Sequence, residues 1–488
     1  MVVRLRVDSG ERRAGMGTIN SAFNIMSGAL DADQQALNVV SNNVANANTP
    51  GYTEEVPDWQ ENQPLYVGGV QDGQGVTETG ATSERDRVLE SRLDQQQQLA
   101  SASGSRLTAL NTMQALFTPD TGSSSSTAGD IGSDITSFFD SFSSLEANPT
   151  DNALRQSVLS SASMLSGDIS NAAASLSSQR TALDQEAAGV ASQVNSLTSA
   201  IAQLNLQIQT TSPNADAGTL EDQRQEDLSQ LSKLIGINQI TAENNGLAVT
   251  TTSGQLLLSE GTSYQLTTGL VNGVTDYFLG NQDITSQLVT GGGSLGGYLT
   301  ARDEDIPNAL SSLDQLAYSI STEVNQQNNA GTALDGATGT ADSPLYIFSQ
   351  PTVVAGSAAG MSVVMTDPNQ IAAAGAGNGT GDNSNAAAMA AMANQGIVNG
   401  QTPSNYYSNF VTTLGSTVSS VQTENTAQTA SVTQLQTQND TLSGVNLNDE
   451  ASSMTTLERS YQAASQVFAM LNTVMAAALN LGDQTAVS

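Results

Sequence analysis

The sequence predicts a mainly α-helical protein with an inserted β domain, which is an α+β fold class. Apolar residues recur every seven positions near both ends of the chain and again over a long interior stretch. Between these stretches, short β-branched and aromatic runs alternate with Gly and Asn turns. We therefore expect N- and C-terminal helices that pair as a coiled coil, a long helical bundle and an outer β domain.

The two ends of the chain carry the same kind of amphipathic helix. The first is expected from Ile19 to Ala47, and the last opens at 443–450 and runs to about Leu481. Their heptad rows would form one apolar seam through which copies polymerise. The residues of this predicted seam are Phe23, Met26, Leu30, Leu37, Val40 and Val44 on the first helix, and Leu447, Met454, Leu457, Tyr461, Phe468, Leu471 and Met475 on the last. Because two helices alone bury little surface, we expect both ends to be disordered before assembly.

A sharp turn follows the first helix. Pro50 cannot continue a helix and Gly51 tolerates a positive φ. Residues 53 to 82 are rich in Gly and Pro, and we expect a loop or small hairpins there, with helix returning at about Ser83.

The interior predicts long helices at 85–117, 152–208, 220–235, 295–327 and 404–442. The longest of them carries apolar residues spaced by seven from Ile169 to Leu204. Two stretches with strand-like patterns, 246–288 and 345–365, are interpreted as two halves of one β domain. The Gly-, Ala- and Asn-rich stretch 372–400 is expected to return the chain to the bundle and to be partly mobile.

These expectations divide the chain into eight segments, and Met1 and Met16 both remain open as the start of translation. The segments are a leader (1–17), the N-terminal half of an inner coiled-coil domain (18–52), the first part of a helical bundle (53–236), the first part of an outer β domain (237–294), a bundle segment (295–332), the second part of the β domain with its return (333–402), the last part of the bundle (403–443) and the C-terminal half of the coiled-coil domain (444–488).

Composition narrows the classes of function. The 488 residues include no Cys and no His, so thiolate nucleophiles, imidazole bases and the preferred zinc and haem ligands are missing. We therefore expect no enzyme, no cofactor and no catalytic or metal site. A formal net charge of -33 with only 14 basic residues argues against nucleic acid as a partner, and the lack of a run of 18 apolar residues argues against a membrane partner.

Two acidic runs are interpreted as ordinary helix surface. Glu221, Asp222, Arg224, Glu226 and Asp227 would form a solvated face with i,i+3 and i,i+4 pairs. The run 303–305 would lie near a helix N-terminus, where acidic side chains favour the helix dipole.

One motif resembles a known family. The residues Asn42, Asn43, Asn46, Asn48, Thr49, Pro50, Gly51 and Tyr52 are similar to the signature of bacterial flagellar axial proteins, the family of rod, hook and hook-associated proteins. The last helix resembles the C-terminal helix of that family. The interior segments 220–236, 295–303, 363–373 and 381–386 resemble the hook-associated members.

The resemblance implies a structural subunit of the bacterial flagellum at the junction between hook and filament. Such a subunit is exported by the flagellar type III apparatus, secreted to the cell exterior and needed for filament assembly and motility. Its implied partners are copies of itself in a ring around the flagellar axis, the hook protein, a second junction protein or flagellin on the filament side, and an export chaperone at the C-terminal helix. The alternatives that remain open are a flagellar hook or distal rod structural protein and, from another class, a secreted cell-wall hydrolase.

Overall fold

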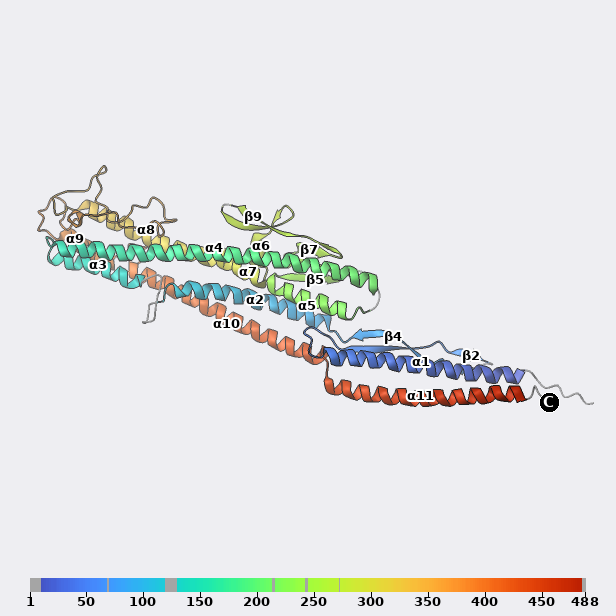
Figure 1. Ribbon diagram of the computed structural model, residues 1–488. Helices are drawn as coiled ribbons and strands as arrows, with labels where there is room; N and C mark the ends of the chain where they lie inside the picture. Colours follow the sequence, from blue (N-terminus) through green and yellow to red (C-terminus); the bar gives the residue numbers. More distant parts are fainter. Residues whose placement is uncertain are drawn as a thin grey trace, which may run out of the picture.

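The protein is a long rod with a helical bundle at one end and a pair of helices at the other (Figure 1). The computed structural model describes residues 10–67, 70–118, 130–212, 216–241, 245–271 and 273–484. Most of the expected leader, 1–9, lies outside them. The predicted fold class is confirmed, because long helices dominate and the β-strands form small antiparallel sheets beside them. No helix in the described ranges has both the length and the apolar composition needed to cross a membrane.

The predicted helical bundle is confirmed. It consists mainly of α2 (Arg87–Ala115), α4 (Asn152–Thr211), α8 (Ile306–Ala330) and α10 (Pro403–Ser443). Asp86 begins α2 and Asp151 begins α4, and each carboxylate accepts hydrogen bonds from two backbone N–H groups of the first turn. At 1.5 Å per residue, the 60 residues of α4 extend about 90 Å, so this one helix spans nearly the whole bundle.

The far end of the bundle contains a helix that the sequence analysis did not predict. It is α3 (Ile131–Ala147), capped by the side chain of Asp130, and it packs against α4 and against α9 (Ser384–Ala391). Phe138, Phe139 and Phe142 are fully or almost fully buried there. These rings make α3 a central part of the larger hydrophobic core.

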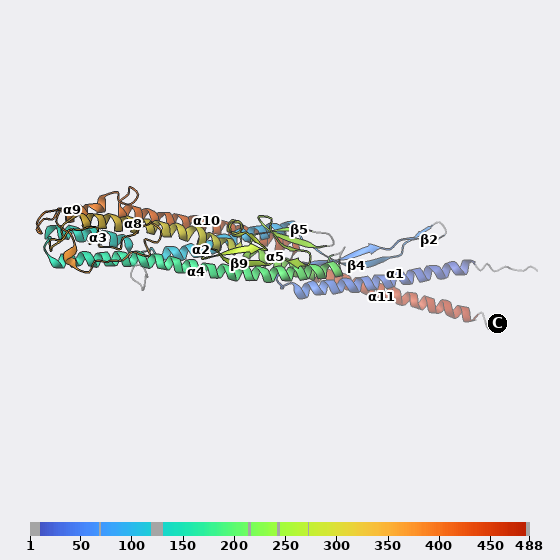
Figure 2. The same ribbon diagram turned by 90° about the horizontal axis from the view of Figure 1, so that it is seen from above.

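The strands lie along the second half of α4 (Figure 2). The first sheet consists of β5 (Ile237–Thr241), β6 (Leu247–Thr251), β7 (Leu256–Ser259) and β8 (Thr262–Ser263), and the second of β9 (Leu266–Val271), β10 (Val274–Leu279) and β11 (Gln282–Asp283). With α5 (Thr219–Leu234), α6 (Thr285–Val289) and α7 (Gly293–Thr300) they cover a second core. Two α4 amides hold the sheets: Asn195 exchanges two hydrogen bonds with the backbone of Leu266, and Asn205 donates to the carbonyls of Leu247 and Glu260.

The prediction that 345–365 completes this β domain is wrong. The segment from 333 to 402 contains only isolated bridges, two short 3-10 turns (η2, Pro368–Gln370, and η3, Met392–Asn394) and α9, and it belongs to the larger core. Side chains of α8 accept the hydrogen bonds that a neighbouring strand would accept in a sheet. Oδ1 of Asn325 accepts from the N–H groups of Ile347 and Phe348, and Oδ1 of Asn328 accepts from the N–H of Ala372. The stretch 372–400 begins within this core, because its residues 372–374 are buried.

The acidic run 303–305 does not lie near a helix N-terminus. It lies within the continuous helix formed by α7, the π turn η1 (Ala301–Asp305) and α8. There the buried guanidinium of Arg302 pairs with Asp184 at 2.5 Å and with Asp303 at 2.8 Å. Arg106 forms two 2.9 Å bonds to Asp305. These ion pairs connect α2, α4 and the π turn.

The other end of the rod consists of α1 (Gly10–Asn46) and α11 (Leu447–Gln484), which run antiparallel side by side in both views (Figures 1 and 2). Strands β1 (Glu55–Glu61) and β4 (Val76–Ser83) form a hairpin ladder that packs against α1, and β2 (Leu65–Val67) pairs with β3 (Val70–Asp72). The predicted pairing of the terminal helices is therefore confirmed, and α1 begins before the expected Ile19.

Candidate assembly site: the end helices and their joint

The seam between α1 and α11 is narrow. Its buried residues are Ala36, Val40 and Leu457, with Leu37 and Met454 packed against them. Further along, the rings of Phe23 and Phe468 lie 4.4 Å apart. The small side chain of Ala36, fully buried in this seam, allows the helices to approach closely, and the heptad pattern does not include it.

The structure places the predicted seam residues in three groups. Val40 and Leu457 are buried between the helices, and Phe23, Met26, Leu30, Leu37, Met454, Phe468, Leu471 and Met475 are half-buried. In contrast, Val44, Leu447 and Tyr461 are exposed, so they do not belong to the seam within one chain. A straight helix drifts by about 20° per heptad, which rotates the ends of a seven-residue row away from a single partner helix.

A second apolar row lies on the outer side of α11. Val467, Met470 and Val474 are 44%, 66% and 47% exposed, and their spacing of three and four places them on one face. The pair formed by α1 and α11 thus buries only a narrow line of apolar side chains and leaves a wider apolar surface exposed.

Asn43 of the family signature connects three segments. Its Nδ2 donates to the carbonyl of Glu55 at 2.8 Å and to Oε1 of Glu450 at 2.6 Å. Its Oδ1 accepts from the hydroxyl of Tyr52 at 2.9 Å and from the N–H of Glu55 at 3.1 Å. All four hydrogen bonds of the amide are made, so this buried side chain joins α1 to the first turn of α11 and to β1.

The other signature residues shape the turn after α1. The N–H of Thr49 donates to the carbonyl of Asn46 at 2.8 Å, and its hydroxyl to the Asn46 side chain at 3.2 Å. Gly51 has a φ of +78°, and a Cβ there would lie 3.3 Å from Oε2 of Glu226 on α5. The turn therefore requires glycine. Asn42, Asn48, Thr49 and Pro50 are exposed.

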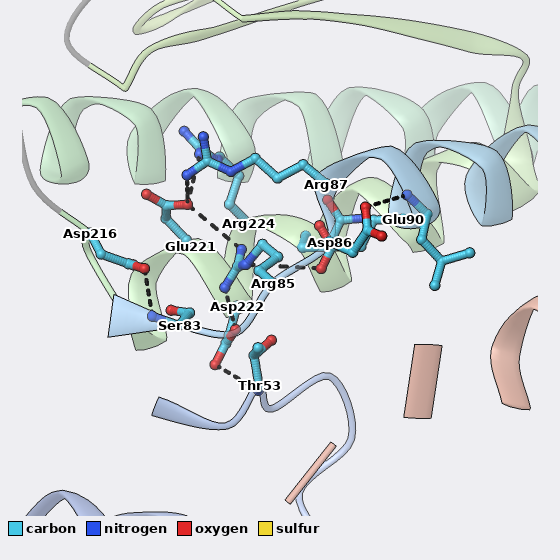
Figure 3. Close-up of polar contacts among 12 residues, drawn as sticks. Thr53, Ser83, Arg85, Asp86, Arg87, Glu90, Asp216, Glu221, Asp222 and Arg224 are labelled. Atoms are coloured by element: carbon cyan, nitrogen blue, oxygen red, sulfur yellow. Dashed lines mark hydrogen bonds and ion pairs between the residues drawn. The ribbon is translucent and has the colours of Figure 1, made fainter. Parts of the chain in front are cut away.

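A buried ion-pair network joins this end of the molecule to the bundle (Figure 3). Arg85, which precedes α2, binds Asp222 through one terminal nitrogen, and its other nitrogens lie 3.7 Å from Glu221 and 3.9 Å from Glu90. Arg87 adds a 2.8 Å contact to Glu221. The Asp222 carboxylate also accepts from the N–H of Thr53 at 3.3 Å, so one side chain of α5 reaches the signature turn.

Two further backbone contacts complete the joint. The N–H of Glu54 donates to the carbonyl of Ser443 at 2.9 Å, at the end of α10. The N–H of Ser83 donates to Asp216 at 2.7 Å. The hairpin is thus attached to the bundle at both of its ends.

The interpretation of 221–227 as a solvated helix face is wrong. Glu221, Asp222 and Arg224 are 1%, 7% and 9% exposed. Arg224 donates to Oδ1 of Asn205 at 3.0 Å and to the carbonyl of Asn245 at 2.7 Å, which links the network to α4 and to the first sheet. The charges are therefore structural, and their partners come from segments far away in the sequence.

Burial raises the pKa of several carboxyl groups at the joint. The pKa of Glu90 rises to about 7, because burial outweighs the attraction of Arg85 and nearby Asp94 adds repulsion. Burial raises the pKa of Asp94 to about 6, although Gln225 and Gln239 donate hydrogen bonds to it. Burial likewise raises the pKa of Asp222, Glu54 and Glu55.

These shifts predict a stability that falls as pH rises. A carboxyl whose pKa is higher in the folded state stabilises the fold at low pH, and this contribution is lost as pH rises through the folded-state value. We expect the free energy of unfolding to fall between about pH 4 and pH 7, most steeply between the ordinary and the raised pKa values of Glu90 and Asp94, and to level off above them. Glu90→Gln should flatten this dependence, measured by urea unfolding at several pH values. Glu61→Gln, at an exposed site of β1, is the matched control and should leave the slope unchanged. Equal slopes in wild type and Glu90→Gln would contradict the assignment.

The described residues contain no group of three or more His, Cys, Asp or Glu placed to hold a metal ion. What the geometry provides is a stiff connection between a bundle and a helix pair with an open apolar face.

Comparisons with known proteins show what this chain is similar to. Residues 120–341 match the family model of the flagellar hook-associated protein FlgK helical domain, and residues 23–53 match that of the flagella basal body rod protein. Flagellar hook-associated protein 1 of Salmonella typhimurium is 29% identical over 333 residues, which cover 66% of this chain and 59% of that protein. The chain is similar to flagellar hook-associated protein 1 over about two thirds of its length.

Two further matches point to the same kind of protein. The Escherichia coli protein is 28% identical over 332 residues, covering 65% of this chain and 58% of that protein. The solved flagellar hook junction protein from Burkholderia pseudomallei shares the fold, with a TM-score of 0.62 at 18% identity over 71% of this chain and 99% of that chain. The match spans less than two thirds of the length of the Salmonella and Escherichia relatives.

Proposed function

We propose that this chain is a structural subunit of the bacterial flagellum that connects hook and filament. The main support is the narrow seam of α1 and α11, which leaves Met470 and its neighbours exposed on a helix pair that projects from the bundle (Figure 1). An apolar helix face that one chain cannot cover suits contact with further copies. The names and the fold of the relatives support the same role.

In this proposal the end helices line an inner tube and the bundle forms the wall outside it. Copies form a ring around the axis by head-to-tail contacts, with the hook protein on one side and a second junction protein or flagellin on the other. The joint around Arg85 and Asn43 holds the two parts at a fixed angle. The role is mechanical and needs no catalytic centre.

The proposed role requires that the chain is exported to the hook-filament junction. The chain would leave the cell through the flagellar type III apparatus and act outside the cell, at the hook-filament junction. An export chaperone would bind the open face of α11 before assembly, by inserting that helix into an apolar groove.

The bundle favours the junction over the alternative of a hook or distal rod protein. The helical-domain match covers residues 120–341, which contain α3, α4, α5 and α8. A rod-type match is confined to the first helix and the turn after it.

A deletion strain tests the proposal. Cells without the gene should build hooks, carry no filaments, release flagellin into the medium and lose motility. Re-expression of the wild-type chain should restore filaments, which electron microscopy of hooks and filaments would show. Normal filaments on the deletion strain would refute the junction role.

A further inference from the structure

A cleft of about 600 Å³ lies at the joint between the signature turn and the bundle. Its walls come from residues 47–53, from α2 and α5, and from the end of α10. Four carboxylates line it, from Glu90, Asp94, Glu226 and Asp440, against a single base, Lys233. The cleft therefore carries an excess of negative charge.

Several oxygen atoms in the cleft wall lack a donor. Oδ1 of Asp94, Oδ1 of Asn439 and Oγ of Ser443 are buried without a hydrogen-bond partner. Asp94 is only 2% exposed and Ser443 only 4%. The other oxygen of Asp94 accepts from both Gln225 and Gln239, at 2.9 and 2.8 Å. Because buried polar atoms are nearly always paired, the acceptor oxygens of Asp94 and Asn439 indicate a missing donor, and the Ser443 hydroxyl can accept from the same group.

The missing group should be a cation with several N–H donors. A guanidinium offers five donors in a plane and no acceptor, which matches a wall of unpaired acceptors and carboxylates. Burial raises the pKa of Glu90 and Asp94, so their charged forms are poorly stabilised within one chain, and a bound cation would stabilise those forms.

The chain has one arginine well placed to supply this group from another copy. Among the arginines whose side chains are described, Arg92 and Arg459 are exposed and make no ion pair or hydrogen bond. Arg92 lies on α2 in the bundle, whereas Arg459 lies on α11 in the helix pair. It lies two residues after Leu457, and a rotation of about 100° per residue turns it away from the seam. Arg459 therefore points outward from the helix pair that, in the proposed function, contacts other copies.

We propose that the acidic cleft at the joint binds the Arg459 side chain of a second copy of this chain. The contact would fix the angle and register between neighbouring subunits, and it rests on the proposed function because it needs copies that meet through their end helices. Within one chain it is out of reach, since Arg459 lies 12 residues beyond the start of α11 at Leu447, about 18 Å along the helix.

Cross-linking can test the contact because the chain has no cysteine. Gln436→Cys places a thiol at the cleft, and Ala463→Cys places one four residues after Arg459 on an exposed site of α11, which leaves the arginine in place. Flagella from complemented cells would be treated with a short bis-maleimide and probed for a dimer of the chain. We expect a dimer from this pair and none from the matched pair Gln434→Cys with Ala463→Cys, because Gln434 lies on the opposite face of α10.

Substitutions at Arg459 test the role of the guanidinium. In the cross-linking background, Arg459→Ala should reduce the dimer by about tenfold, and Arg459→Glu should reduce it further. Asp440→Lys, at the exposed rim, should restore part of the dimer in the Arg459→Glu variant by reversing the charge pair. Removal of residues 1–15, which contain Arg4, Arg6, Arg12 and Arg13, should leave the dimer unchanged.

The outcomes separate this inference from the proposed function. Filamentous flagella that yield no dimer from the Gln436 pair, or a dimer insensitive to Arg459, would overturn the inference and leave the junction role standing. A dimer lost only on removal of residues 1–15 would assign the cleft to the N-terminal arginines and overturn the choice of Arg459. Filaments that form without the chain would instead refute the proposed function.

Discussion

Arg85→Met should lower the free energy of unfolding by about 3 kcal/mol and abolish motility. The methionine keeps much of the volume but leaves Asp222 without its countercharge, and the side chain of Arg85 is only 6% exposed. Glu221 keeps contacts with Arg87 and Arg224, so the cost should come mainly from the single carboxylate of Asp222. Urea unfolding of the purified chain measures the loss of stability, and swarming of a complemented strain measures function.

Two companion variants isolate the cause. Arg92→Met makes the same change on α2 at an exposed site, and this arginine has no ion pair among the described residues, so stability should change little. Asp222→Asn in the Arg85→Met background should recover part of the loss, because it removes the unpaired buried charge. Equal losses from Arg85→Met and Arg92→Met would mean that the network does not hold the joint.

The helical part of the fold could be predicted because helix patterns are local. The row from Ile169 along α4 and the caps at Asp86 and Asp151 can be read within a few turns of sequence. The helix α3 also has a local pattern that predicts it, since the cap residue Asp130 precedes apolar residues at helical spacing, namely Ile131, Ile135, Phe138 and Phe142. The sequence of this segment is therefore sufficient to predict α3.

The structure of the segment 345–365 could not be predicted in the same way. Its β-branched residues fit a strand pattern, but the hydrogen bonds of Ile347 and Phe348 go to the side chain of Asn325 on α8. Strand formation depends on a partner strand, and a short apolar run does not specify one. The same reasoning applies to the buried return, whose alanines pack against helices from elsewhere in the chain.

Only part of the candidate site could be predicted from the sequence. The signature could be found by resemblance, whereas the role of Asn43 depends on Glu450, 407 residues away in sequence. The i,i+3 spacing of Glu221 and Arg224 is typical of a solvated face. The cluster is buried because Arg85 and Asn205 of α4, both distant in sequence, pack against it. Patterns within one helix do not tell which side of it another segment will cover.

Phe468→Asp should leave the main melting transition of the monomer nearly unchanged and yet abolish filament assembly. The ring of Phe468 contacts Phe23, and the seam core around Val40 and Leu457 is separate from the two cores of the bundle and sheets. An unpaired charge in an apolar helix contact costs on the order of several kcal/mol. This cost should weaken the packing of α1 against α11 and the contacts with other copies, and not the bundle. Differential scanning calorimetry measures the transition, and complementation of the deletion strain measures assembly.

A second aspartate separates the two faces of α11. Met470→Asp changes the exposed outer row and leaves the Phe23 contact intact, so it should also abolish filaments, with no effect on the end pair of the monomer. Asn472→Asp adds the same charge at an exposed polar site and should still support motility. Hydrogen exchange of the monomer should then show faster exchange over α1 and α11 in Phe468→Asp than in Met470→Asp. If Phe468→Asp instead lowers the main transition by many degrees, the end helices fold as one unit with the bundle, and their seam is not an independent, marginal contact that waits for neighbouring copies.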